Sequence, residues 1–217
     1  SIVTAEKPKK ALIPIPAFSE YEQALRTVDC RIRYHLLEEK ENFRLTERFL
    51  DDLTEDLDMV FLCSPSNPAG QVIPEQLLRG ILDRCREKEI RIVLDECFIE
   101  FTDREKRFCA EKLFRDLPCL FAVRAFTKMN AIPGLRLGYG ITSDTGLLER
   151  MRMARQPWSV SIPAQEAGMA ALSEAEERKA DKTRALIRAE RARMEEMLAG
   201  LGLRVIPSEA NFILMYS

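Results

Sequence analysis

Short apolar runs of strand length alternate with helical segments along the first two thirds of this 217-residue chain. The runs that predict strands are residues 11–15, 30–36, 59–63, 91–94, 120–123 and 135–141. Apolar spacing predicts helices over 19–28, 46–53, 74–85 and 109–115, with Ser19 as an N-cap and Pro74 in a first turn. Such alternation favours a mostly parallel sheet with helices on both faces. We therefore expect an α/β fold, a three-layer sandwich with a mostly parallel central sheet.

The sequence changes character after Leu147. Charged helical segments continue to Leu201 with an interruption at 156–158, and the dense charges predict a solvated helix face. Residues 204–206 and 211–215 then predict two strands of a second layer. We expect residues 1–160 to form a central large domain, 161–201 to be long linking helices, and 202–217 to begin a small α+β C-terminal domain.

Composition excludes several classes of protein. With 33 basic and 35 acidic residues, the net charge of −2 gives no electrostatic footprint for nucleic acid. No apolar run is long enough to span a membrane and no signal peptide is recognisable, so we expect a cytoplasmic protein. The six cysteines lack Cys-x-x-Cys spacing and are expected to be reduced thiols. A single histidine, His35, disfavours a metal site and Ser-His-Asp chemistry.

Three polar residues each follow a predicted strand. Asn67, Asp95 and Lys128 would meet at the carboxyl edge of a parallel sheet, where ligands gather. Lys128 follows an apolar run and precedes Arg136 by eight residues, inside a Gly-Leu-Arg-Leu-Gly stretch. An amine attacks a carbonyl only when it is deprotonated, so we expect a partly buried site that lowers the pKa of Lys128. Arg136 would then be the fixed cation that holds a phosphate.

These residues match the needs of pyridoxal 5'-phosphate (PLP). The cofactor requires a lysine for its aldehyde carbon, a carboxylate for its ring nitrogen, a donor for its phenolic oxygen and a cradle for its phosphate. Lys128, Asp95, Asn67 and Arg136 supply one of each. Taken singly, Asp95 can be a helix cap and Asn67 a turn former. Taken together and at strand ends, they predict PLP as the cofactor and residues 1–160 as its binding domain.

The sequence resembles the fold-type I, class I and II aminotransferases. Within that family it is most similar to the branch that contains histidinol-phosphate aminotransferase and threonine-phosphate decarboxylase. The resemblance is carried by residues 16–21 (PAFSEY), 66–70 (SNPAG), 95–101 (DECFIEF) and 126–139. It implies that Phe18 stacks on the cofactor ring, Asn67 donates to the phenolic oxygen and Asp95 pairs with the ring nitrogen. It also implies that Lys128 is the Schiff-base lysine and that Arg136 binds the phosphate. The alternative for Phe18 is an ordinary core aromatic.

Three departures from the family pattern stand out. Phe98 replaces a frequent tyrosine and removes a second donor to the phenolic oxygen, which favours the decarboxylase members of the branch. Ala125 replaces a hydroxyl residue and removes one phosphate contact. The resemblance also places a phosphate loop before this sequence and most of a small domain, with a carboxylate-binding arginine, after it. We therefore expect the chain alone to be weakly active or inactive.

Two classes of function remain open. The first is a PLP-dependent enzyme that acts on a small phosphorylated amino compound, threonine-phosphate decarboxylase-like in the favoured version and histidinol-phosphate aminotransferase-like in the alternative. The second is a truncated, non-catalytic fragment. A nucleotide-binding domain is set aside because Pro14 and Pro16 replace the expected glycine-rich turn. The resemblance further implies an amino-acid-like substrate and a homodimer.

Overall fold

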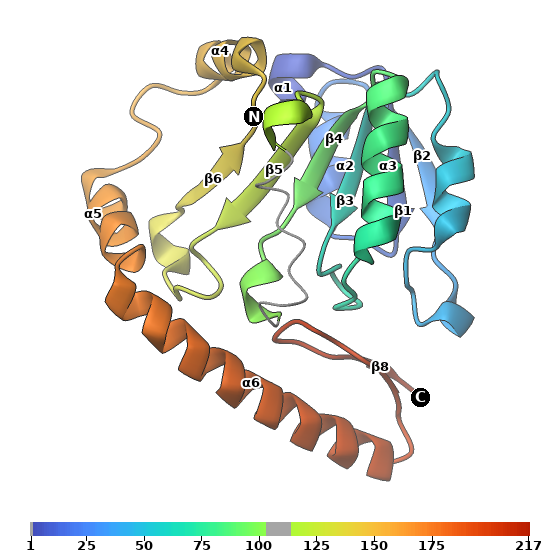
Figure 1. Cartoon of the computed structure of the whole chain (residues 1–217), viewed down its shortest axis with the longest axis vertical. Helices are drawn as coiled ribbons and strands as arrows, with labels where there is room; N and C mark the ends of the chain where they lie inside the picture. Colours follow the sequence, from blue (N-terminus) through green and yellow to red (C-terminus); the bar gives the residue numbers. More distant parts are fainter. Residues whose placement is uncertain (1, 103–113) are drawn as a thin grey trace.

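The computed structural model describes residues 2–102 and 114–217, and the centre of this part of the chain is a six-stranded sheet (Figure 1). The strands are β1 (Lys10–Ile15), β2 (Arg31–Leu36), β3 (Met59–Cys63), β4 (Arg91–Asp95), β5 (Leu120–Ala125) and β6 (Gly138–Ile141). Their order is β2-β1-β3-β4-β5-β6. The pairs from β2 to β5 are parallel, whereas β6 runs antiparallel to β5. The predicted α/β fold with a mostly parallel sheet is confirmed.

One face of the sheet packs against α3 (Glu75–Glu87) and the 3-10 helix η2 (Glu47–Asp52). Successive side chains of a strand point to opposite faces, so alternate residues such as Leu12, Val60 and Leu94 enter this core. Burial of these aliphatic side chains stabilises the layer by roughly 1.5–3 kcal/mol each.

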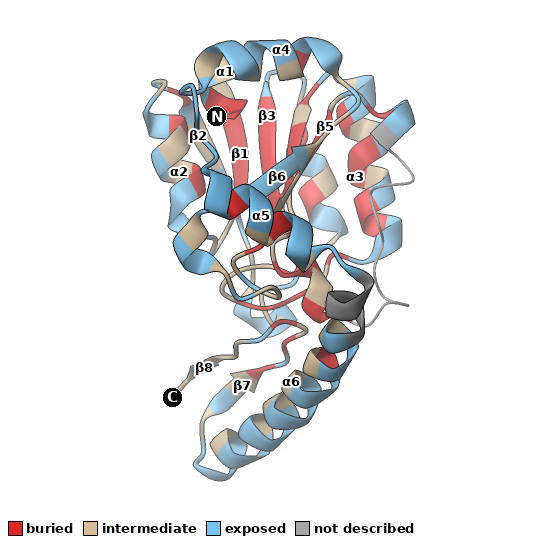
Figure 2. Ribbon diagram, turned by 90° about the vertical axis from the view of Figure 1, so that its left-hand side faces the viewer, coloured by how far each residue is buried: buried red, intermediate tan, exposed pale blue. Residues whose placement is uncertain are grey.

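The other face packs against α1 (Ile2–Glu6), α2 (Ser19–Arg26) and α4 (Thr145–Ala154). The intervening strand residues, among them Ile13 and Phe61, enter this second core. Helices α1 and α4 lie side by side over the same end of the sheet (Figures 1 and 2). Helices therefore cover both faces, which gives the expected three layers.

Beyond the sheet, the chain continues through α5 (Ile162–Ala171) and the 27-residue helix α6 (Glu174–Gly200). A two-stranded antiparallel sheet follows, made of β7 (Arg204–Ile206) and β8 (Leu214–Tyr216). Figure 2 shows that α6 is largely exposed along its length. The division into the domains 1–160, 161–201 and 202–217 stays a prediction.

The segment between β7 and β8 returns to the loop that follows β3. Gly70 has a φ of +70°, and a Cβ added there would lie 2.0 Å from the Ser208 Oγ. The backbone N–H of Glu209 donates to the Gly70 carbonyl at 2.8 Å, and the Gln71 side chain donates to the Pro207 carbonyl. Only a residue without a side chain allows this approach, so Gly70 fixes the C-terminal segment to the loop.

Several predicted helix boundaries are wrong in detail. Phe18 is the N-cap of α2 and Ser19 is its first residue, with no side-chain cap hydrogen bond, because the extended backbone of Phe18 starts the helix one residue earlier. Pro74 likewise is the N-cap of α3 and not part of its first turn. The predicted helix over 46–53 is the 3-10 helix η2. Most of the predicted helix over 109–115 lies outside the described residues.

The predicted strand over 135–141 begins only at Gly138. Pro133–Leu135 forms the 3-10 turn η7, and Arg136 closes it with a left-handed φ of 55°. The proline fixes its own φ and favours a turn over an extended strand at this point. Among the described residues, no helix is long and apolar enough to cross a membrane.

Candidate functional site

All five predicted site residues line one cavity at the carboxyl edge of the sheet. Its volume is about 560 Å³, and Phe18, Asn67, Asp95, Lys128 and Arg136 are among its walls. Phe18, Asn67 and Lys128 follow β1, β3 and β5, and Asp95 ends β4, so four parallel strands deliver them to one edge. Arg136 precedes β6, and because β6 is antiparallel its beginning lies at that same edge.

Lys128 projects from the loop after β5. Its Nζ lies 4.8 Å from the centroid of the Phe98 ring, which places the amine over the face of a buried aromatic. The side chain is exposed, so the expectation of a partly buried lysine is wrong for the chain as described. The physical reason is that the cavity opens to solvent on this side. Desolvation of the amine therefore requires something that covers the cavity.

Asp95 is held by two hydrogen bonds to its carboxylate. The Tyr21 hydroxyl donates to Oδ2 at 2.6 Å, and the backbone N–H of Cys97 donates to Oδ1 at 2.9 Å. The carboxylate is half-buried and faces the cavity. Each oxygen has one fixed neutral donor, and a carboxylate oxygen has room for a second.

The thiols beside Asp95 are not reactive groups. Burial, followed by the negative charge of Asp95, raises the pKa of both Cys63 and Cys97 well above the ordinary range for a thiol. A thiol held in its protonated form is a poor nucleophile. We therefore assign no chemistry to these cysteines. The described cysteines form no disulfide.

A buried ion pair supports the floor of the cavity. Arg124 Nε donates to Glu96 Oε2 at 2.9 Å, and the Glu96 side chain is only 2% exposed. Burial alone would lower the pKa of Arg124, but Glu96 and Tyr139 together outweigh it and raise that pKa. Arg124 lies on β5 and Glu96 directly follows β4, so the pair joins the two strand ends that carry Lys128 and Asp95.

Phe98 connects the cavity to the C-terminal segment. Its ring makes an edge-to-face contact with Phe212 at 4.9 Å between centroids. Both belong to a small apolar cluster that includes Phe101, Ala210 and Met129, the neighbour of Lys128. The side chain at position 98 is therefore a packing residue and offers no hydrogen-bond donor to a ligand.

Of the other three predicted residues, Asn67 is half-buried, whereas Phe18 and Arg136 are exposed. Phe18 is 42% exposed and meets Tyr21 edge to face, so it is not the ordinary core aromatic that was the alternative. Arg136 is exposed, and its guanidinium donates to the Pro133 carbonyl at 3.0 Å. Ala125, at the end of β5, also lines the cavity and presents only a methyl group. Position 125 therefore offers no hydroxyl to a ligand, whereas Arg136 offers a guanidinium at the same cavity.

The residues present fit PLP in chemical type and in size. A volume of about 560 Å³ lies within the range of about 300–1,000 Å³ for small-molecule sites. An amine, a carboxylate, an amide, a guanidinium and an exposed aromatic face converge there. In the described part of the chain, no three His, Cys, Asp or Glu side chains group as metal ligands. The individual roles of the five residues stay predictions.

Sequence reasoning missed two contributions to this site, the Tyr21 hydroxyl and the Glu96–Arg124 pair. A signal for Tyr21 was present, because a residue three positions after Phe18 lies on the same side of the first helical turn. No spacing rule links Glu96 to Arg124, which meet only because β4 and β5 are neighbours.

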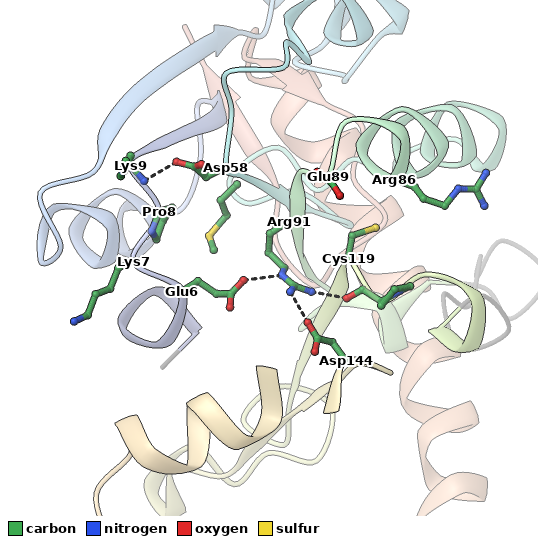
Figure 3. Close-up of a pocket in the computed structure, with 12 residues that line it drawn as sticks. Glu6, Lys7, Pro8, Lys9, Asp58, Arg86, Glu89, Arg91, Cys119 and Asp144 are labelled. Atoms are coloured by element: carbon green, nitrogen blue, oxygen red, sulfur yellow. Dashed lines mark hydrogen bonds and ion pairs between the residues drawn. The ribbon is translucent and has the colours of Figure 1, made fainter. Parts of the chain in front are cut away.

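A second cavity of about 630 Å³ lies at the opposite, amino edge of the sheet (Figure 3). At its centre Arg91 bonds Glu6 at 3.1 Å, Asp144 at 2.6 Å and the Pro118 carbonyl. Its charged lining residues are basic and acidic in equal number. We assign this network a structural role, since it ties α1 and the start of α4 to β4, and no predicted site residue lines it.

Comparison with known proteins identifies the family of this chain. The sequence model of the family "Aminotransferase class I and II" matches residues 1–217. The chain is 40% identical over 216 residues to threonine-phosphate decarboxylase of Salmonella typhimurium, covering 99% of the chain and 58% of that protein. It is 36% identical to histidinol-phosphate aminotransferase of Methanosarcina barkeri, covering 97% of the chain and 54% of that protein.

A solved structure of a histidinol-phosphate aminotransferase is similar in fold to this chain. The histidinol-phosphate aminotransferase from Clostridium acetobutylicum superposes with a TM-score of 0.88 at 31% identity, over 99% of this chain and 63% of that one. The chain thus spans somewhat more than half the length of the relatives it matches. On the match of the whole chain and the convergence of the five side chains, the chain belongs to the class I and II aminotransferase family.

Proposed function

We propose that this chain belongs to a PLP-dependent enzyme that acts on a small phosphorylated amino compound, in the manner of a threonine-phosphate decarboxylase. The class I and II aminotransferases are PLP-dependent. The observation that carries the proposal is the convergence of Lys128, Asp95, Asn67 and Arg136 on one cavity. The 40% identity to a threonine-phosphate decarboxylase supports the substrate class.

The chain's residues divide the work by chemical type. When bound, PLP supplies an electron sink for a bond that breaks at the α-carbon of an amino acid. Lys128 would hold the aldehyde carbon and, once displaced by a substrate amine, carry a proton to or from the α-carbon. Asp95 would face the ring nitrogen and Asn67 the phenolic oxygen. Arg136 would bind the phosphate, and Phe18 would cover one face of the ring.

Phe98 favours decarboxylation over amino transfer. Its ring lies against the Lys128 amine and donates no hydrogen bond, so the phenolic oxygen loses a donor that a tyrosine would supply. Histidinol-phosphate aminotransferase activity is the second candidate, supported by the relatives of that name. In decarboxylation the bond to the carboxylate breaks, carbon dioxide leaves and a proton takes its place. In transamination Lys128 instead removes the α-proton.

The first experiment tests whether Lys128 carries the cofactor. The purified chain is mixed with PLP, its visible absorbance is recorded, and the product is reduced with borohydride and mapped by peptide mass. We expect the label on Lys128, and Lys128→Arg to abolish it. Lys179→Arg, on α6, is the matched control and should leave the label unchanged. A label spread over surface lysines would refute the assignment and favour a non-catalytic fragment.

The second experiment separates the two activities. The intact protein is supplied with threonine phosphate, and carbon dioxide is measured with and without a keto acid. A decarboxylase releases carbon dioxide without the keto acid. An aminotransferase reacts only when the keto acid is present, and it releases no carbon dioxide. If the protein transfers the amino group of threonine phosphate and releases no carbon dioxide, the decarboxylase proposal is rejected.

We also propose that the protein is a cytoplasmic homodimer in which a second copy covers the open side of the cavity. Large apolar side chains are exposed from the end of α4 through α5, including Met153, Trp158, Ile162 and Leu172, and Trp158 is 97% exposed. A cluster of large exposed apolar side chains along one stretch of the chain favours an interaction site. Light scattering during gel filtration tests it, with Trp158→Ser expected to shift the protein toward monomer. If the wild-type protein already has the mass of a monomer, the homodimer proposal is refuted.

A further inference from the structure

Tyr21 contacts two of the predicted site residues, Phe18 and Asp95. Its hydroxyl donates to Asp95 at 2.6 Å, and its ring meets Phe18 edge to face at 5.7 Å with an interplanar angle of 82°. Phe18 is the predicted stacking residue and Asp95 the predicted partner of the ring nitrogen. One side chain from the first turn of α2 therefore touches both.

The Tyr21 side chain is itself held in place. It is 9% exposed, and its ring stacks on Phe61 of β3 at 5.2 Å with an interplanar angle of 25°. A phenol clamped between two aromatic rings has little freedom to rotate. Its hydroxyl is therefore a fixed donor, not one that swings into place after a ligand arrives.

The hydroxyl also keeps its proton. Burial, together with Cys63 and Asp95, raises the pKa of Tyr21 far above the ordinary phenol value. Loss of the proton would place a phenolate against a carboxylate in a poorly solvated site. Tyr21 thus holds its proton more firmly than an exposed tyrosine and acts as a neutral donor at neutral pH.

The two hydrogen bonds to Asp95 fix the orientation of its carboxylate in the cavity. Tyr21 occupies Oδ2 and the Cys97 N–H occupies Oδ1, and rotation of the Asp95 carboxylate would break both hydrogen bonds. A carboxylate has about four acceptor sites, more than these donors fill, and the Asp95 carboxylate lines the cavity. Groups that fix a binding side chain from behind raise affinity because the side chain need not be ordered when the ligand binds.

We propose that Tyr21 is a positioning residue that orients the Asp95 carboxylate toward the ring nitrogen of the bound cofactor. This inference rests on the proposed function, because it assumes that PLP occupies the cavity. Tyr21 does not touch the reacting atoms and acts only through Asp95 and Phe18. Tyr21→Phe removes a single oxygen and keeps the aromatic stack, so its effect isolates the hydroxyl.

The test compares two ligands on the same protein. One is PLP, and the other is the analogue in which a carbon atom replaces the ring nitrogen, so that it cannot bond Asp95. Dissociation constants are measured for both by fluorescence titration, on the intact wild-type protein and on Tyr21→Phe. Because the ratio of the two constants is taken within each variant, any loss of folded protein cancels from it.

We expect the wild type to prefer PLP, and Tyr21→Phe to reduce that preference about tenfold, the scale of one charge-assisted hydrogen bond. Tyr216→Phe is the matched control, since its hydroxyl donates to the Glu39 carboxylate at 2.7 Å away from the cavity, and it should change nothing. An unchanged preference in Tyr21→Phe, or no preference in the wild type, overturns the inference. A wild type that binds neither ligand instead overturns the proposed function itself.

Discussion

Gly70→Ala tests how the C-terminal segment is held on the loop that carries Asn67. The added Cβ would lie 2.0 Å from the Ser208 Oγ and 2.7 Å from its Cβ, so one of the two segments must move. Forcing a methyl group into packed structure costs about 1–3 kcal/mol. The left-handed backbone of an L-residue adds about 1–2 kcal/mol. We therefore expect a total loss of about 3 kcal/mol in the free energy of unfolding, measured by urea denaturation.

A double-mutant cycle separates the two causes. Ser208→Gly removes the atoms that clash, so Gly70→Ala should cost about 1–3 kcal/mol less in that background, while the backbone cost remains. In thermal melting, the single variant should lose about 6–12 °C for a chain of this size. Gly200→Ala is the matched control, because a Cβ there meets nothing within 4 Å. Equal costs of Gly70→Ala in the two backgrounds would refute the steric argument.

Three further predictions concern a thiol, the buried ion pair and the phosphate contact. Burial raises the pKa of Cys85 from 9.0 to about 12, so the folded state retains a proton that the unfolded chain releases. Stability should be unaffected below pH 9 and fall as the pH rises toward 12, and Cys85→Ala should flatten this decline in urea titrations. Glu96→Ala should destabilise the fold by about 3 kcal/mol, since it removes the carboxylate that faces the largely buried Arg124 guanidinium. If Glu96→Ala alone costs less than the double variant of Glu96→Ala with Arg124→Met, this reasoning is contradicted. Arg136→Gln should weaken PLP binding about tenfold and leave pyridoxal, which has no phosphate, unaffected in the same titration.

Sequence patterns predicted the sheet because each buried strand is a short apolar run with polar residues at its end. The same patterns predicted that Asn67, Asp95 and Lys128 lie at one edge of the sheet, since parallel strands end together, and all three line the cavity there. They did not predict the exposure of Lys128, because burial depends on what covers a cavity and not on the residues around the lysine in the chain.

Other details depend on contacts between distant residues. The Tyr21–Asp95 hydrogen bond and the Glu96–Arg124 pair join separate strands or layers, so no local pattern encodes them. The starts of α2 and β6 differ in detail from the sequence-based predictions for a different reason. The backbone angles of Phe18 and Arg136, and not their side-chain preferences, decide where α2 and β6 begin.

The reversed strand β6 has a consequence for the order in which the cavity assembles during folding. Lys128 and Arg136 lie in the connection between antiparallel neighbours, and the pair Ala125–Gly138 closes that connection. Closing a short loop costs little entropy, so these two cations come together as soon as the β5–β6 hairpin forms. Phe18 and Asp95 meet only after several parallel strands have been aligned, which is slow. A full-length chain that refolds would therefore attract phosphate before it can recognise a ring.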